Sequence, residues 1–133
     1  MNQKITKLLA EKGLASYMND TKWRKLSEGI ENLPFSPAYQ VKTLFEDEPY
    51  PAVIEIATDW LGDWGRTPEA ALGVHIEWIK VAPKFKRYMG RLVTPIFEDC
   101  SDELRALLEA ISIPFVEKDG FFVIYGHARE VDF

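Results

Sequence analysis

The hydrophobic pattern of this chain changes its period at Pro34 and Pro37, and that change limits the folds that the chain can adopt. Before the prolines, apolar side chains recur at the spacing of an amphipathic helix. They are Trp23, Leu26, Ile30 and Leu33. From Tyr39 to Phe45 the period becomes two, as in a half-buried strand. Because proline cannot continue a helix, both helix and sheet are expected in this chain of 133 residues.

Two more helices are predicted, one at the N-terminus and one in the last third. The N-terminal helix has an apolar stripe of Ile5, Leu8 and Leu9 and ends at Gly13. The helix after it starts at one of three polar residues that can accept hydrogen bonds from free N–H groups. They are Asn19, Asp20 and Thr21. The last helix starts at Asp99 or Ser101 and ends at Pro114. Its apolar stripe consists of Leu104, Leu107, Leu108 and Ile111.

Alternating or continuous apolar segments predict five strands. The segments are Tyr39–Phe45, Ala52–Thr58, Val74–Val81, Phe115–Glu117 and Phe121–Tyr125. Lys118, Asp119 and Gly120 separate the last two as in a hairpin, because glycine adopts positive φ at little cost. The element order is helix, helix, three strands, helix, two strands (ααβββαββ). We therefore expect residues 1–133 to form one α+β domain, with a mainly antiparallel sheet of about five strands and helices packed on one face.

Strict alternation along the central strands assigns their side chains to two faces. The helix-covered face is predicted to hold Val41, Phe45, Ile54, Ile56, Ile76 and Trp78. The opposite face is predicted to hold Lys42, Leu44, Val53, Glu55, Ala57, His75, Glu77 and Ile79. Carboxylates beside an imidazole could form an acid–base site, with Glu55 or Glu77 as base and His75 as acid. The same charges could instead pair across strands.

Composition restricts the compartment and the partner. The net charge is −5 and the pI is near 5.1, which makes nucleic acid an unlikely partner. The single cysteine, Cys100, cannot form an internal disulfide, as expected in a reducing compartment. No apolar segment is long enough for a membrane span, and the charged N-terminus lacks the apolar region of a signal peptide. We expect a soluble, cytoplasmic protein with no membrane partner.

Acidic and aromatic residues in the middle of the chain predict a protein-binding surface. Glu46, Asp47 and Glu48 form an acidic tract. A glycine- and aspartate-rich loop follows at Asp59–Arg66, and exposed tryptophan near arginine is typical of binding hot spots. The contact residues predicted in this loop are Asp59, Trp60, Asp63, Trp64 and Arg66. The alternative is that both indole rings fold back over the core.

A basic segment, Lys84–Arg91, has aromatic residues between its cations, as in proteins that bind single strands. The alternative is a solvated connection in which Phe85 and Tyr88 are anchored in the core.

The sequence gives little indication of a metal or cofactor site. His75 and His127 lie far apart, and Cys100 has no cysteine partner at zinc spacing. Glycine-rich phosphate loops and serine nucleophile motifs are absent from the sequence. We expect no metal site, no cofactor and no assigned catalytic residue.

Several short motifs together resemble a small family of uncharacterised bacterial proteins, from about Trp23 onward. The motifs are Trp23, Leu33-Pro34-Phe35, Val41-Lys42, Trp78-Ile79, Gly90-Arg91-Leu92 with Pro95, Ile113-Pro114-Phe115, Asp119-Gly120 and Ile124-Tyr125-Gly126. His127 departs from the aromatic residue expected after Gly126. The resemblance implies no activity and no catalytic residue. Size and acidity are also loosely similar to those of immunity proteins that neutralise toxins.

The leading hypothesis is a small protein-interaction module, of immunity type, that binds a basic protein. An enzyme that uses Glu55, Glu77 and His75 and a nucleic-acid binder that uses Lys84–Arg91 are the alternatives. Homodimerisation through an edge strand or the open sheet face is compatible with all three.

Overall fold

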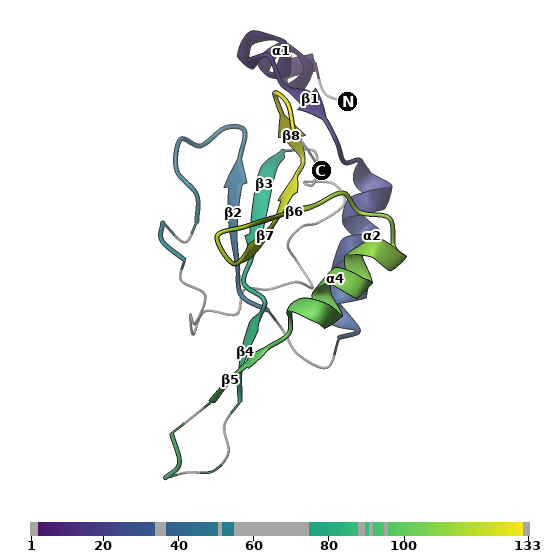
Figure 1. The fold of residues 1–133 in the computed structure, drawn as a ribbon. Coiled ribbons are helices and arrows are strands. Elements are labelled where there is room, and N and C mark those ends of the chain that lie inside the picture. Colours follow the sequence, from purple (N-terminus) through teal and green to yellow (C-terminus); the bar gives the residue numbers. More distant parts are fainter. Residues whose placement is uncertain are drawn as a thin grey trace.

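The computed structural model describes residues 3–33, 37–50, 52–54, 75–87, 90, 92–94 and 96–131 (Figure 1). Its helices are α1 (Gln3–Lys12), α2 (Asp20–Glu31) and α4 (Ser101–Ala110). Its strands are β1 (Ala15–Ser16), β2 (Tyr39–Thr43), β3 (Ile76–Val81), β4 (Lys84–Arg87), β5 (Ile96–Asp99), β6 (Val116–Lys118), β7 (Phe121–Tyr125) and β8 (His127–Ala128). Within these ranges, no helix has the length and apolar character of a membrane span.

The strands pair antiparallel throughout, in one main sheet and two ribbons. The main sheet has the order β2-β3-β7-β6, and the ribbons are β1-β8 and β4-β5. The α+β class and the antiparallel sheet are thus confirmed. The predicted strand at Ala52–Thr58 is wrong over residues 52–54, which lie outside any strand, and the rest of it lies outside the described residues.

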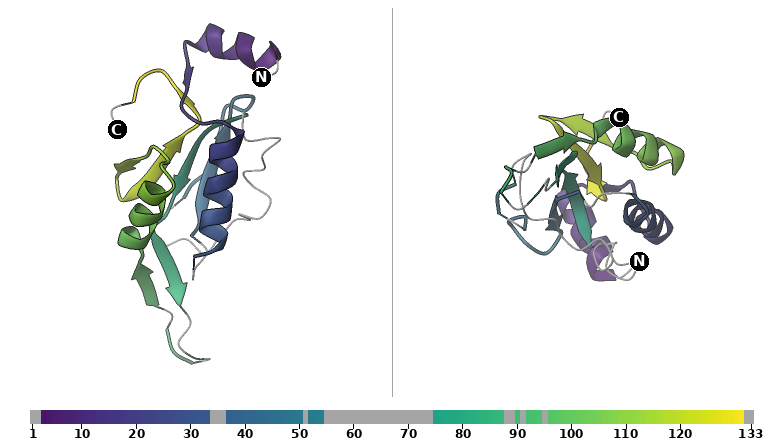
Figure 2. Two further views of the ribbon diagram at one scale, coloured as in Figure 1. Left: turned by 90° about the vertical axis from the view of Figure 1, so that its right-hand side faces the viewer. Right: turned by 90° about the horizontal axis from the view of Figure 1, so that it is seen from below.

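Helices α2 and α4 lie side by side on one face of the main sheet (Figure 2, left). The side chain of Asn19 accepts a hydrogen bond of 2.9 Å from the backbone N–H of Lys22, so it is the N-cap of α2. The residues of the main core are buried between these two helices and the sheet. They are Met18, Trp23, Leu26, Ile30, Tyr39, Ile76, Ile79, Val81, Leu104, Leu108, Ile113, Phe122 and Ile124.

A bulge at Glu77 puts the residues of β3 that follow it on the faces opposite to those that strict alternation predicts. Lys42 pairs with Trp78, but Thr43 pairs with Ile76, so Glu77 has no partner on β2. Ile79 is therefore fully buried in the helix-covered core, and the prediction that it faces the other way is wrong. The prediction for Trp78 is wrong for the same reason, since it lies on the face opposite Ile79.

Leu44 and Phe45 also depart from the faces that strict alternation predicts, because the strand ends before them, at Thr43. Leu44 is buried in a second, smaller cluster with Ile5 and Leu9 of α1. Phe45, predicted in the core, is 46% exposed. The N-terminal helix therefore packs at the end of the sheet, beside the loop that follows β2 (Figure 1).

The β6–β7 hairpin is confirmed, with Asp119 at φ 54° and Gly120 at φ 84°. Two successive residues with positive φ are typical of a type I′ turn, which matches the twist of its strands. By contrast, the C-terminal end of α4 differs from the prediction. The helix ends at Ala110, four residues before Pro114, because Ser112 adopts φ 57° and its N–H bonds back to the carbonyl of Glu109.

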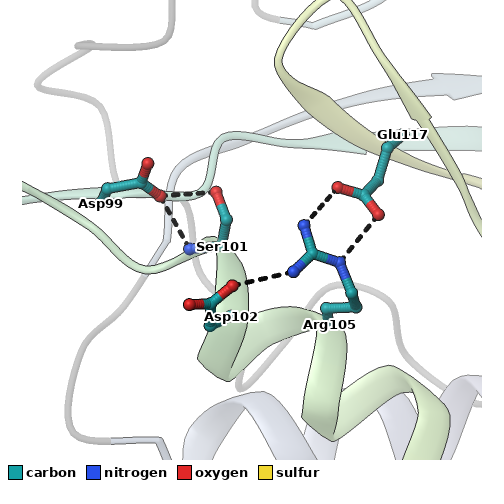
Figure 3. A network of polar contacts seen from close by, with 5 residues as sticks. All are labelled: Asp99, Ser101, Asp102, Arg105 and Glu117. Carbon is teal, nitrogen blue, oxygen red and sulfur yellow. Dashed lines mark hydrogen bonds and ion pairs between the residues drawn. The ribbon is translucent and has the colours of Figure 1, made fainter.

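An ionic network joins the first turn of α4 to β6 (Figure 3). Asp99 accepts hydrogen bonds from the N–H of Ser101 (2.9 Å) and from its hydroxyl (2.5 Å). The Arg105 guanidinium donates to both carboxylate oxygens of Glu117, at 2.9 and 2.6 Å, and to Asp102 at 2.9 Å. The hydrogen bonds from Arg105 to Glu117 hold the pKa of Glu117 below its usual value.

Arg105→Gln should destabilise the fold most near neutral pH. A lowered pKa in the folded state means that the pair stabilises the protein above the unfolded pKa of Glu117, about 4.3, and loses this effect as pH falls through the folded pKa. The difference in free energy of unfolding between wild type and variant, measured with urea from pH 7 to pH 3, should therefore shrink as pH falls. A difference that is constant across this range would indicate that Arg105 acts through packing alone.

Candidate functional site

The acidic tract lies in a loop that the structure attaches firmly at both ends. We call residues 45–50 the acidic loop. At its start, the N–H of Leu44 donates to the carbonyl of His75 at 2.8 Å. At its end, Tyr50 exchanges two backbone hydrogen bonds with Val41, at 2.8 and 2.9 Å. The loop therefore extends the outer edge of β2 and is held in one place.

The acidic loop presents carboxylates and apolar side chains together. Glu46, Asp47 and Glu48 are all exposed, and Tyr50 is 64% exposed. Val53, just beyond the loop, is 75% exposed. Among the residues that the structure describes, no cation forms an ion pair with any of the three carboxylates. The negative charge of the loop is therefore available to a partner.

The aromatic side chain that begins the loop contacts two basic residues. The ammonium group of Lys4 lies 5.2 Å from the centroid of the Phe45 ring, and the His75 ring meets Phe45 edge-on at 5.1 Å. Sequence reasoning identified the three acids, but it missed Tyr50 and Val53 as their exposed neighbours. A turn tract with prolines gives no periodicity from which exposure could be predicted.

The other predicted contact residues lie outside the described residues. These are Asp59, Trp60, Asp63, Trp64 and Arg66. Their assignment to a protein-binding surface stays a prediction.

The groups of the acid–base hypothesis are partly brought together. Lys42 Nζ lies 2.5 Å from Glu77 Oε2, so these two residues form an ion pair across β2 and β3. His75 precedes β3 and contacts Phe45. Glu55 lies outside the described residues. The observed Lys42–Glu77 contact is the cross-strand pairing that the sequence left open as an alternative.

The basic segment begins with a strand, not with a connection. Lys84–Arg87 pairs with Ile96–Asp99, and this ribbon extends away from the main sheet (Figure 1). Lys84 Nζ lies 4.0 Å from Asp99 Oδ2. Beyond the strands, Leu92 and Val93 are exposed. Binding of nucleic acid by this segment stays a prediction.

His127 and Cys100 are both buried, and each makes a hydrogen bond within the protein. His127 is 3% exposed, and its Nδ1 lies 2.8 Å from the Ser16 hydroxyl, which ties β8 to β1. The buried Cys100 thiol donates to the carbonyl of Glu98 at 3.7 Å. In the described ranges, no three His, Cys, Asp or Glu side chains gather where they could hold a metal ion.

Comparison with known sequences matches a family model over nearly the whole chain. Residues 5–131 match DUF6678, a family of unknown function. The chain belongs to this family. The resemblance to a family without assigned activity is thus confirmed, and DUF6678 extends it to the N-terminal helix. No curated protein and no solved structure matches the chain.

Proposed function

We propose that this member of DUF6678 is a protein-interaction module that binds a basic protein through the acidic loop. An immunity-type inhibitor of a basic toxin is the specific form of this function that we favour. The proposal places the protein in the cytoplasm, where its single cysteine would stay reduced. The supporting observation is that Glu46, Asp47 and Glu48 are exposed beside the exposed ring of Tyr50.

The attachment of the loop favours tight binding. Its two ends are hydrogen-bonded to β2 and to the residue before β3, so little backbone freedom is lost when a partner binds. Ordering flexible segments at an interface reduces affinity, and a loop that is already held avoids much of this loss. Tyr50 would act as the central contact, because tyrosine contributes a large rigid surface and a hydroxyl group.

Charge would determine how fast the partner arrives. The whole chain carries −5, and the acidic loop concentrates three negative charges in three successive residues. Complementary potentials raise association rates and reject partners of the same sign. In this proposal Trp60 and Trp64 are further anchors, and Asp59 and Asp63 are further charges, as the sequence predicts.

Charge reversal of the loop should remove binding. We would compare wild type, E46K/D47K/E48K and E11K/E31K/E109K as baits in a lysate of the organism that encodes the chain. The control acids are exposed residues near the C-terminal ends of helices. Each triple change removes three negative charges and adds three positive ones, so both variants go from −5 to +1 and differ in where the charge lies.

The expected result is one basic protein recovered by wild type and by the helix variant, and reduced about tenfold or more by the loop variant. Its recovery should also fall as salt rises from about 50 mM to about 500 mM, since salt screens exposed charges. A partner that both variants retain, or that both lose, would contradict the role of the loop.

A further inference from the structure

The face of the main sheet opposite α2 and α4, which we call the open face, carries a regular set of side chains. Trp78 of β3 is directly opposite Tyr125 of β7, and the next pair on this face is Lys80 opposite Val123. One step further, Phe121 of β7 is opposite Lys118 of β6. The two central strands therefore place aromatic rings and a lysine on one surface.

A hollow of about 260 Å³ lies on this face. It is lined by Trp78, Lys80, Lys118, Asp119, Val123 and Tyr125. Val123 is 3% exposed and forms an apolar floor, whereas Trp78 and Tyr125 are half-buried, so that part of each side chain remains accessible. The residues at the rim are the exposed Lys118 and Asp119 of the β6–β7 turn.

One lysine that lines the hollow, Lys80, contacts aromatic rings and not a carboxylate. Lys80 Nζ lies 5.6 Å from the centroid of the Trp78 ring and 5.5 Å from that of Phe121. Among the described residues it forms no ion pair, in contrast to Lys42 on the same face, whose charge is matched by Glu77. Cation–π contacts position an ammonium group but leave its positive charge uncompensated. Two lysines and one aspartate line the hollow, which gives it a net positive charge.

We propose that this hollow binds a mononucleotide, with the base against Trp78 and Tyr125 and the phosphate at Lys80. Half-buried aromatic rings favour a planar ligand, and base–aromatic stacking contributes about 1–3 kcal/mol per base. An uncompensated lysine over the rings of Trp78 and Phe121 favours an anion. At about 260 Å³ the hollow is smaller than the roughly 300–1,000 Å³ of sites that enclose a drug-sized ligand, so a bound nucleotide would stay partly in solvent. A net charge of −5 opposes a polyanionic strand and so favours the free nucleotide.

Isothermal titration calorimetry of the intact chain with AMP, GMP, CMP and UMP tests this proposal. At least one nucleotide should bind, and its nucleoside and ribose 5-phosphate should each bind about tenfold more weakly, because each lacks one of the two contacts. An oligonucleotide of ten deoxythymidines is titrated in the same way to test binding of a single strand. Binding of the oligonucleotide about tenfold or more tighter than any mononucleotide would overturn the assignment to a free nucleotide.

Two variants test the contact of Lys80 with the phosphate and that of Trp78 with the base. Lys80→Met should weaken nucleotide binding about tenfold and leave nucleoside binding unchanged, whereas Trp78→Leu should weaken both. Lys7→Met, which removes an exposed lysine from α1, is the control and should bind as wild type does. Thermal melting verifies that each variant folds, and Lys80→Gln replaces Lys80→Met if the latter unfolds. Failure of all four nucleotides to bind, or unchanged affinity in the folded lysine variant, would overturn the proposal.

Discussion

Gly126→Ala is expected to destabilise the protein by about 3 kcal/mol or more, because the added methyl group has no space. A Cβ atom at this position would lie 2.0 Å from the backbone oxygen of Ile76 and 3.1 Å from the ring of Trp23. The N–H of Gly126 donates to the carbonyl of Glu77 at 2.8 Å, and its own carbonyl accepts from Tyr17 at 2.9 Å. The glycine is thus fixed between β3 and the segment before α2 and cannot move away.

Urea denaturation would measure this effect, and a second glycine in the chain is a matched control. At Gly29 in α2, the closest atoms to a Cβ atom would all belong to the side chain of Leu107, with its terminal Cδ1 nearest at 2.9 Å. That side chain can turn aside, and alanine is the better helix former by about 1 kcal/mol, so Gly29→Ala should change stability little. Trp23→Phe should not rescue Gly126→Ala, because the closest contact is with backbone. Equal effects of the two alanine substitutions would contradict this explanation.

Trp23→Ala is expected to cost about 3–5 kcal/mol of the free energy of unfolding, the range for truncating a large buried aromatic residue. Trp23 is 1% exposed in the main core, where it packs between α2 and the sheet. Since small domains are stable by only about 5–15 kcal/mol, the variant should be partly unfolded at physiological temperature.

The control for this substitution is Trp78→Ala on the open face. Trp78 is half-buried, so its truncation removes less buried surface and should cost less than half as much. Chemical denaturation of both variants would provide the comparison. A larger loss of stability from Trp78→Ala would contradict the assignment of the two indole rings to the two faces.

Elements with local signals could be predicted from the sequence. Asn19 caps α2 because its side chain reaches the N–H of Lys22, three residues along the same chain. The hairpin turn depends on Asp119 and Gly120, which adopt positive φ side by side. In both cases the residues that determine the geometry are neighbours in sequence, so a local pattern is sufficient.

Features that depend on distant pairing could not be predicted. The bulge at Glu77 exists only because β2 and β3 pair in one register, and a single extra residue exchanged the faces of Trp78 and Ile79. Pairing of Lys84–Arg87 with Ile96–Asp99 was missed because a basic segment ahead of a turn has no clear period. The sequence therefore located the acidic loop but not the hollow, whose residues gather only when β3, β7 and β6 are in register.

The most direct test of the proposed function is carboxylate footprinting of the protein alone and in complex with its captured partner. A carbodiimide couples an amine to accessible carboxylates, and mass spectrometry gives the extent of labelling at each one. We expect Glu46, Asp47 and Glu48 to be protected in the complex, while Glu28 and Glu31 on α2 are labelled as in the free protein. Protection of the α2 carboxylates with full labelling of the acidic loop would contradict the proposed function.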